Sequence, residues 1–337
     1  MTSDSRDGLA AGRAFAGAGL AVIFGTDDAE ALANADLVFD PGFGAPADRR
    51  AILAKVAPAL HGDAICATMA AGTLDDLFDQ ARTLGIHFFY PADDRVFVEV
   101  IRPAAGSPAA TLAVLRMLKR MGKQAVVATS LEGIAGAMMT ARQHAAELLV
   151  AQGRADPQAI DAALCRYGFE EGVFAWLDRI GLDTAWLATG WAGDALRARL
   201  CTAGRTGAAA GKGFYDYDAS GKRVAAAPTP PTSQILSDED LLDALLLPIA
   251  NVALKLVEQG AVVRESDADL VAVTAHGWPT WRGGPLFHLN HASDAARAVA
   301  LLQRLAQDDP DFYAPARTLI ERAAGAGADL PITERVT

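Results

Sequence analysis

The stretch GIHFFYPADDRVFVEVI at residues 85–101 decides the fold of the front part of the chain. Its two apolar runs, IHFFYP at 86–91 and VFVEVI at 96–101, are rich in aromatic and β-branched residues, which predicts two strands that follow each other in the chain. Each run carries one ionisable side chain, His87 in the first and Glu99 in the second. If the two strands are neighbours in a sheet, they bring this imidazole and this carboxylate together.

Strands and helices alternate on both sides of this stretch. Alternating β and α elements of this size predict a mainly parallel, doubly wound sheet in an α/β domain over residues 1–128. The further strands are expected at 20–24, 36–40, 64–68 and 124–128, and the helices at 8–18, 27–35, 46–59, 73–84 and 107–121.

From residue 129 onward the pattern of apolar residues predicts helices only, so an all-α part follows the α/β domain. Residues 219–237 collect Gly, Pro, Ser and Thr, a composition typical of an exposed linker. This linker divides the helical part into a first domain over 129–218 and a second domain over 238–330.

The two helical domains resemble each other in sequence. AAELLVAQGRADPQAIDAAL at 145–164 matches VALKLVEQGAVVRESDADLV at 252–271. Each segment is followed by a glycine and an aromatic residue, at 168–169 and at 277–278. We therefore expect two copies of one helical domain that pack as a pseudo-dimer.

The composition excludes several classes of function. The 337 residues are 51% hydrophobic and can bury a large core. A formal net charge of −11 supplies no basic face for a nucleic acid. No apolar run approaches the ~18 residues that a membrane span needs, and the polar start MTSDSRDG carries no targeting signal. We expect a cytoplasmic protein whose partners are small molecules or proteins.

The three cysteines predict neither disulfides nor a metal centre. Cys66, Cys165 and Cys201 are an odd number, are widely spaced and include no CxxC pair. None has a histidine at the spacing that metal ligands use. We expect three reduced thiols and no metal site.

Five stretches of the chain carry a resemblance to a known family: NADLVFD at 34–40, GIHFFYP at 85–91, VFVEVIRP at 96–103, AGRTGAAAGKGFYDYD at 203–218 and GWPTWRGGP at 277–285. Together they resemble the 3-hydroxyacyl-CoA dehydrogenase family, in particular the dehydrogenase half of multifunctional fatty-acid oxidation enzymes. The resemblance runs from about residue 20 to the end, and its last motif indicates the form with two C-terminal helical domains behind a Rossmann-like domain.

The resemblance assigns roles to His87 and Glu99. In the family, a histidine at the end of the HFF strand takes the proton of the substrate's 3-hydroxyl, and a glutamate on the VEVI strand orients it. His87 and Glu99 match these positions. An imidazole suits proton transfer near neutrality, and a carboxylate at its far nitrogen selects one tautomer. We expect the two to form a catalytic dyad.

The chain also departs from the family at its NAD-binding front end. It has no GxGxxG loop, and the candidate loop at residues 3–8 holds Asp4 and Asp7, which would repel a pyrophosphate. In the alignment that starts near residue 20, the family's second strand and its ribose-binding acid have no counterpart. The NAD-binding domain is therefore predicted to be truncated and degenerate.

Further departures lie where the family binds nicotinamide and substrate. Gly44 replaces a family glutamate, although Arg49 keeps the positive charge of the family's lysine and is the one predicted cofactor-binding residue. Residues 69–72, Met-Ala-Ala-Gly, replace the family's Asn-Thr-Ser motif, and Ala137 replaces an asparagine that faces the substrate. Of the polar groups around the reacting centre, the dyad remains.

These departures favour an acyl-CoA enzyme that uses the dyad without redox chemistry and without a cofactor. Removing the 3-hydroxyl proton without a hydride acceptor leaves cleavage of the C2–C3 bond, a retro-aldol lyase reaction, or other proton-transfer chemistry. One alternative is an NAD-dependent 3-hydroxyacyl-CoA dehydrogenase, and another is a non-catalytic scaffold or subunit. The expected partner is an acyl-CoA thioester. The tandem helical domains favour a monomer, with a homodimer as the alternative.

Three residues of the GWPTWRGGP motif allow two interpretations. Trp278, Trp281 and Arg282 could stack on an adenine ring. Aromatic side chains in such glycine-rich turns more commonly fill a seam between packed domains, while the glycines let the backbone pass close by. We expect the structural role.

Overall fold

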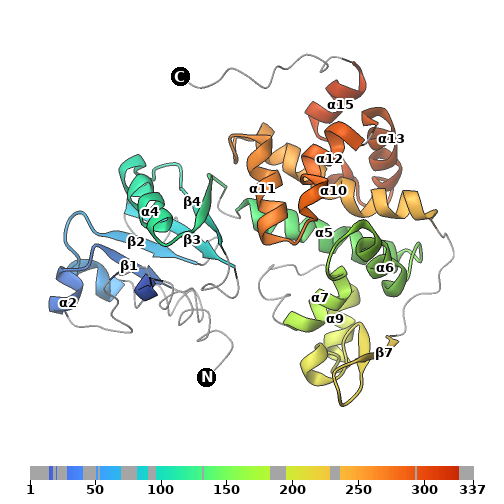
Figure 1. Cartoon of the computed structure of the whole chain (residues 1–337), viewed down its shortest axis with the longest axis horizontal. Coiled ribbons are helices and arrows are strands. Elements are labelled where there is room, and N and C mark those ends of the chain that lie inside the picture. Colours follow the sequence, from blue (N-terminus) through green and yellow to red (C-terminus); the bar gives the residue numbers. More distant parts are fainter. Residues whose placement is uncertain are drawn as a thin grey trace. The chain divides into compact units, whose positions relative to one another are not determined.

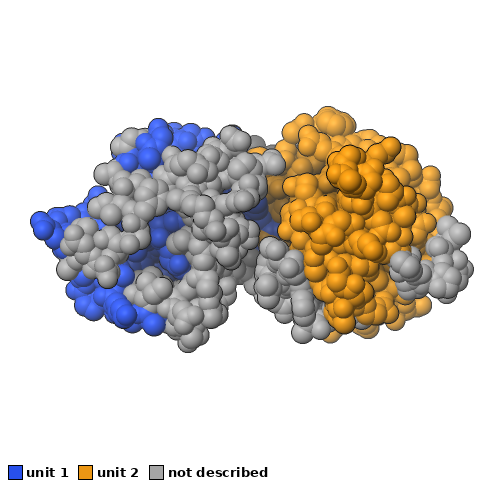
Figure 2. Space-filling view, turned by 90° about the horizontal axis from the view of Figure 1, so that it is seen from below, with its two compact units in different colours: residues 1–135, 259–267 blue, residues 136–258, 268–337 orange. Residues whose placement is uncertain are grey.

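The computed structural model of the chain describes residues 15–17, 20, 29–40, 51, 54–69, 82–89, 96–130, 133–182, 195–227, 236–292 and 294–325. The chain divides into two compact units (Figures 1 and 2). Unit 1 comprises Met1–Ala135 and Gln259–Asp267, and unit 2 comprises Gly136–Glu258 and Ala268–Thr337. No helix among the described residues is long and apolar enough to cross a membrane.

Unit 1 contains a five-stranded sheet whose strands lie in chain order. Three of the four pairings are parallel, which confirms the predicted mainly parallel sheet, and the pairing of β3 with β4 is antiparallel. Only residues 89–96 separate these two strands, whereas a parallel pair needs a crossover of about a dozen residues or more. The strands are β1 (Leu37–Asp40), β2 (Ile65–Thr68), β3 (Thr83–Phe88), β4 (Phe97–Ile101) and β5 (Gln124–Ala128).

Some expected elements of unit 1 can be compared with the structure, and others lie outside the described residues. The helix α2 (Ala29–Ala33) and the 3₁₀ turn η1 (Ala57–Ala59) fall inside predicted helices. The end of the helix expected over 73–84 is wrong, because Thr83 and Leu84 pair with β2 as the start of β3. Both are buried, so tertiary pairing overrides the local pattern. The strand expected at 20–24 lies outside the described residues, apart from Leu20.

Helix α4 (Pro108–Arg120) confirms the helix expected at 107–121. The Ser107 side chain accepts a hydrogen bond from the Ala110 N–H at 3.3 Å, and Pro108 occupies the first turn, where no N–H is needed. Lys119 and Arg120 lie in the last turn, where positive charge complements the helix dipole.

The two faces of the sheet differ because side chains alternate along each strand. On one face, alternate residues of β3 and β4 join α4 in the hydrophobic core of unit 1. The residues between them, His87 on β3 and Glu99 on β4, therefore project from the opposite face. The core includes Phe15, Ala67, Leu84, Ile86, Phe88, Val98, Val100, Ala110, Val114 and Leu118.

Unit 2 is mainly helical (Figure 1). Helix α5 begins at Ile134 in unit 1 and continues through unit 2. The helices are α5 (Ile134–Ala151), α6 (Pro157–Tyr167), α7 (Val173–Ile180), α9 (Ala195–Thr202), α10 (Asp238–Glu258), α11 (Glu265–Ala275), α12 (Pro285–Ala292), α13 (Ala295–Leu305), α14 (Pro310–Tyr313) and α15 (Arg317–Ala323), with 3₁₀ turns η4 (Ala208–Ala210) and η5 (Thr280–Arg282).

A β-hairpin corrects the expectation of helices only after residue 129. Strand β6 (Tyr215–Tyr217) pairs antiparallel with β7 (Arg223–Ala226), so part of the predicted linker over 219–237 is a strand. The Asp218 carboxylate accepts hydrogen bonds from the N–H groups of Ser220 and Lys222. The polar and glycine residues that suggested a linker therefore form a tight turn between two strands.

Asp161 joins three elements of unit 2. Its carboxylate accepts hydrogen bonds from the N–H groups of Phe174 and Ala175 at the start of α7, both at 3.0 Å, and from the Tyr215 hydroxyl at 2.8 Å. Gly172 makes room for it, because a Cβ there would overlap the carboxylate. The buried carboxylate therefore ties α6 to α7 and to the hairpin.

Replacing Asp161 by alanine should lower the free energy of unfolding of unit 2 by about 3 kcal/mol, because it leaves buried donors without an acceptor. Asp294→Ala is the matched control, since Asp294 caps α13 at an exposed position and should contribute about 1 kcal/mol. All five tryptophans lie in unit 2, so tryptophan fluorescence during urea unfolding reports this unit. Equal losses for the two variants would contradict the role given to Asp161.

Candidate active site

The structure places His87 and Glu99 directly opposite each other on neighbouring strands. They are register partners in the antiparallel pairing of β3 with β4. Side chains at directly opposed positions project from the same face of the sheet, and their Cβ atoms lie about 5 Å apart. The two residues predicted as a dyad are therefore brought together, on the face opposite the α4 core.

The Glu99 carboxylate lies on the first turn of helix α5. With 2% of the residue exposed, its Oε1 accepts hydrogen bonds from the N–H groups of Ile134, at 2.5 Å, and Ala135, at 3.3 Å. Burial raises the pKa of Glu99 to about 7, although the bonds from Ile134 and Ala135 act in the opposite direction. Near neutral pH the group can therefore hold or release a proton.

The His87 ring is partly buried and neutral at pH 7. Its ring contacts Phe89 edge-on, with 4.7 Å between the centroids. Burial lowers the pKa of His87 to about 4, because the charged imidazolium loses solvation there. A neutral imidazole has a nitrogen lone pair that can accept a proton from a hydroxyl group.

Sequence reasoning did not find the partners of Glu99 at the start of α5. Ile134 and Ala135 act through backbone N–H groups, which any residue type except proline supplies. The sequence marks this place only by Gly133, a glycine directly before the helix. Its φ of +71° explains why a glycine is found there.

Of the two tryptophans of GWPTWRGGP, Trp278 is buried as a structural role predicts, whereas Trp281 is 72% exposed. Trp278 is buried and contacts the rings of Tyr167 and Phe169 at centroid distances of 5.6 and 5.5 Å. The Arg282 guanidinium lies 4.7 Å from the centre of the Tyr167 ring. Trp281 packs on Gly168, where an added Cβ would come within 2.7 Å of the indole. The motif thus packs against the end of α6.

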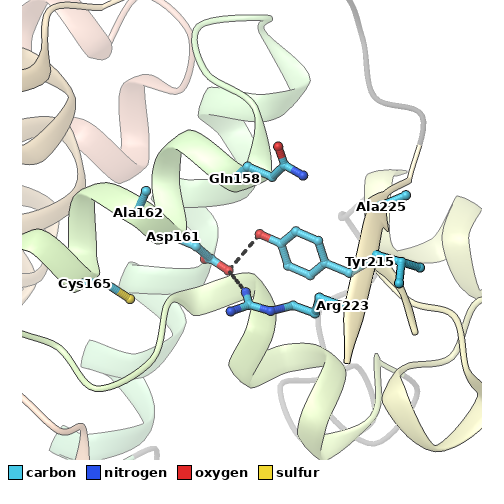
Figure 3. Close-up of a pocket in the computed structure, with 8 residues that line it drawn as sticks. Gln158, Asp161, Ala162, Cys165, Tyr215, Arg223 and Ala225 are labelled. Carbon is cyan, nitrogen blue, oxygen red and sulfur yellow. Dashed lines mark hydrogen bonds and ion pairs between the residues drawn. The ribbon is translucent and has the colours of Figure 1, made fainter. Parts of the chain in front are cut away.

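Unit 2 also holds a cavity of about 290 Å³ between α6 and the hairpin (Figure 3). In it, the Tyr215 hydroxyl and the Arg223 guanidinium both approach the Asp161 carboxylate, at 2.8 and 3.7 Å. Since Asp161 is already bonded to α7, this cluster holds the hairpin on α6. The lining residues are Gln158, Asp161, Ala162, Cys165, Tyr215, Arg223, Val224 and Ala225.

Two family models match consecutive parts of the chain. The model of the 3-hydroxyacyl-CoA dehydrogenase NAD binding domain matches residues 6–131, and the model of the 3-hydroxyacyl-CoA dehydrogenase C-terminal domain matches residues 134–217. The chain belongs to the 3-hydroxyacyl-CoA dehydrogenase family. This confirms the resemblance found in the sequence.

Curated relatives of this dehydrogenase family member include peroxisomal bifunctional enzymes. The enzyme of Cavia porcellus is 26% identical over 322 residues, which cover 83% of this chain and 44% of the relative. The Homo sapiens enzyme is 27% identical over 329 residues, covering 85% of this chain and 45% of the relative. The chain thus spans less than half the length of these relatives. Its own compartment, expected to be the cytoplasm, stays a prediction.

Solved structures show the same fold. The 3-hydroxybutyryl-CoA dehydrogenase of Escherichia coli K12 has a TM-score of 0.73 at 21% identity, with coverage of 89% of this chain and 83% of the other. The dehydrogenase part of multifunctional enzyme 1 from C. elegans has a TM-score of 0.60 at 20% identity, with coverage of 90% and 74%. The family fold is therefore shared over most of the chain.

The described part of the dehydrogenase sheet is compatible with a bound dinucleotide. Such ligands bind outside the carboxyl ends of parallel strands, which are formed here by Asp40 of β1 and Thr68 of β2. The Thr68 hydroxyl donates a hydrogen bond to Asp40 Oδ2 at 2.8 Å. The match to an NAD-binding model favours NAD over the expectation that no cofactor is used.

The structure describes some of the residues at which the sequence departs from the family, and others lie outside the described residues. Gly44, Arg49 and residues 70–72 lie outside the described residues. Met69 follows β2 and packs against the core of unit 1, and Ala137 lies in α5.

The described residues hold no cluster of His, Cys, Asp and Glu that could bind a metal ion. Their free thiols are Cys66, buried, Cys165, exposed, and Cys201, partly exposed.

The dyad predicts opposing pH dependences of stability. A His87 pKa lowered to about 4 makes unit 1 more stable as pH rises from about 4 to 6.5. A Glu99 pKa raised to about 7 makes it less stable as pH rises from about 4.5 to 7. Each contribution is on the order of 3 kcal/mol, so the two largely cancel in the parent chain.

Single substitutions should separate the two pH dependences of the free energy of unfolding. Relative to the doubly substituted H87Q/E99Q chain, His87→Gln should lose stability as pH rises through this range, and Glu99→Gln should gain it. Calorimetric unfolding at a series of pH values measures both slopes. Two slopes of the same sign would contradict the pKa shifts described for the pair.

Proposed function

We propose that the chain is an NAD-dependent 3-hydroxyacyl-CoA dehydrogenase that oxidises the 3-hydroxyl group of an acyl-CoA thioester. The observation that carries the proposal is the His87–Glu99 pair, which lies in a chain matched by the family's NAD-binding and C-terminal models. Two of the similar solved structures are themselves named as 3-hydroxybutyryl-CoA dehydrogenases. This alternative is better supported than the non-redox reaction expected from the sequence.

His87 is proposed as the catalytic base. The neutral imidazole accepts the proton of the substrate's 3-hydroxyl as the C–O bond becomes a carbonyl, while NAD, when bound, supplies the hydride acceptor. Ionised Glu99, on the same face of the sheet, stabilises the imidazolium that results. Because the hydrogen bonds from Ile134 and Ala135 hold the Glu99 carboxylate, its charge stays beside the base.

NAD is proposed to lie at the carboxyl ends of β1 and β2, near Asp40 and Thr68. Arg49 remains the proposed residue for an anionic part of the cofactor or substrate, because a guanidinium pairs well with phosphate. An acyl-CoA thioester is the proposed substrate class.

We also propose that the helical part of the chain contains two copies of one helical domain, with limits near 129–218 and 238–330; residues 129–135 and 259–267 of these copies belong to unit 1. A repeated capping arrangement supports the proposal. The Asp161 carboxylate of α6 accepts from the first N–H groups of α7, and the Asp269 carboxylate of α11 accepts in the same way from Leu286 and Phe287 in α12. In each case a glycine, at 172 or 284, lies against the aspartate. The duplication favours a monomer.

The activity can be tested with a panel of 3-hydroxyacyl-CoA thioesters and NAD, following NADH absorbance. His87→Gln should lower kcat/KM by about 10²–10⁴-fold, because it removes the proton acceptor. His291→Gln, an exposed position on α12, should leave the rate unchanged.

Parallel incubations without NAD, read by mass spectrometry, separate the alternatives. Cleavage products in the absence of NAD, together with no binding of NADH by fluorescence titration, would replace the dehydrogenase with a lyase. No reaction under either condition would favour a non-catalytic subunit.

A further inference from the structure

Gly133 lies between the sheet and helix α5, at the point where the Glu99 carboxylate is held. Its φ is +71°, a left-handed conformation that glycine adopts without strain. A Cβ added at Gly133 would lie 2.5 Å from Glu99 Oε2 and 3.0 Å from Glu99 Cδ. Two independent features, the backbone angle and the carboxylate contact, therefore act against a side chain here.

Neither partner of this contact has room to move. Glu99 is 2% exposed, and its Oε1 is bonded to the N–H groups of Ile134 and Ala135. The Gly133 N–H donates a hydrogen bond to the Ser130 carbonyl at 3.0 Å. The neighbouring Thr129 donates from its N–H to Ala261 O and from its hydroxyl to Gly260 O, both at 2.9 Å. A larger residue at 133 must therefore displace the carboxylate or the helix start.

We propose that Gly133 is a positioning residue for the His87–Glu99 pair, because its missing side chain lets the Glu99 carboxylate lie on the first turn of α5 opposite His87. The catalytic meaning of this role rests on the proposed function. The positioning itself does not, since it concerns the location of one carboxylate relative to one imidazole.

A matched control separates the two features of Gly133. Gly122, in the same unit, also has a φ of +71°, but a Cβ there would meet nothing within 4 Å. Gly122→Ala therefore measures the effect of the backbone angle alone. Gly133→Ala adds the contact with Glu99.

The first measurement needs no enzymatic activity. The titration of the His87 imidazole, followed by NMR, should shift its midpoint in G133A and stay at the parent value in G122A, because only G133A moves the neighbouring carboxylate. In an E99A background, adding G133A should change the His87 midpoint no further. An unchanged midpoint in G133A, or the same shift with and without the Glu99 carboxylate, would overturn the proposal.

The second measurement uses the oxidation of a 3-hydroxyacyl-CoA by NAD. G133A should lower kcat/KM by roughly 100-fold, as expected for a displacement of about 1 Å near the base, and should alter the pH profile. G122A should keep the parent rate and profile. If the parent chain proves inactive, the proposed function fails while the NMR result still decides the role of Gly133.

A folding failure of G133A remains informative. With Glu99 replaced by alanine, a Cβ at position 133 no longer meets a carboxylate. E99A/G133A should then fold as well as E99A/G122A, judged by the dispersion of amide resonances in NMR spectra. A failure of E99A/G133A alone would show that Gly133 is needed for its own backbone conformation and not for Glu99, which overturns the proposal.

Discussion

The candidate site depends on the hydrogen bonds that the buried Glu99 carboxylate accepts. A carboxylate loses solvation in a protein interior, and the N–H groups of Ile134 and Ala135 replace part of it. The compensation is incomplete, so burial still raises the pKa of Glu99 to about 7. The same hydrogen bonds hold the carboxylate of His87's register partner at the start of α5, where a Cβ at Gly133 would overlap it. The burial and hydrogen bonding of Glu99 thus bear on the position of its carboxylate, on its pKa and on the backbone at Gly133.

The antiparallel pairing of β3 with β4 makes this arrangement possible. It sets His87 opposite Glu99 in register, whereas the rest of the sheet pairs in parallel. Alternation along both strands then separates two environments, with Ile86, Val98 and their neighbours against α4 on one face and the ionisable pair on the other. The core and the site are therefore two faces of the same pair of strands.

The dyad by itself serves more than one reaction, because a base that removes a 3-hydroxyl proton can lead to oxidation or to C–C cleavage. A hydride acceptor distinguishes the two outcomes. The match of residues 6–131 to an NAD-binding family model supports oxidation, despite the substitutions that first suggested lyase chemistry. In unit 2, the buried Asp161 and the partly buried Asp269 each cap a later helix, so carboxylates that accept backbone N–H groups organise both units.

The sequence by itself determined the features that local patterns encode: the strands around His87 and Glu99, helix α4, and the family. Tertiary structure alone decided the register of β3 on β4, the hydrogen bonds from Ile134 and Ala135 to Glu99, and the β6–β7 hairpin, part of which looked like a linker. Apolar periodicity reports which elements form, because it reflects local burial. The donors that hold Glu99 are backbone groups 35 and 36 residues away, and a backbone N–H leaves no signature in the amino-acid sequence.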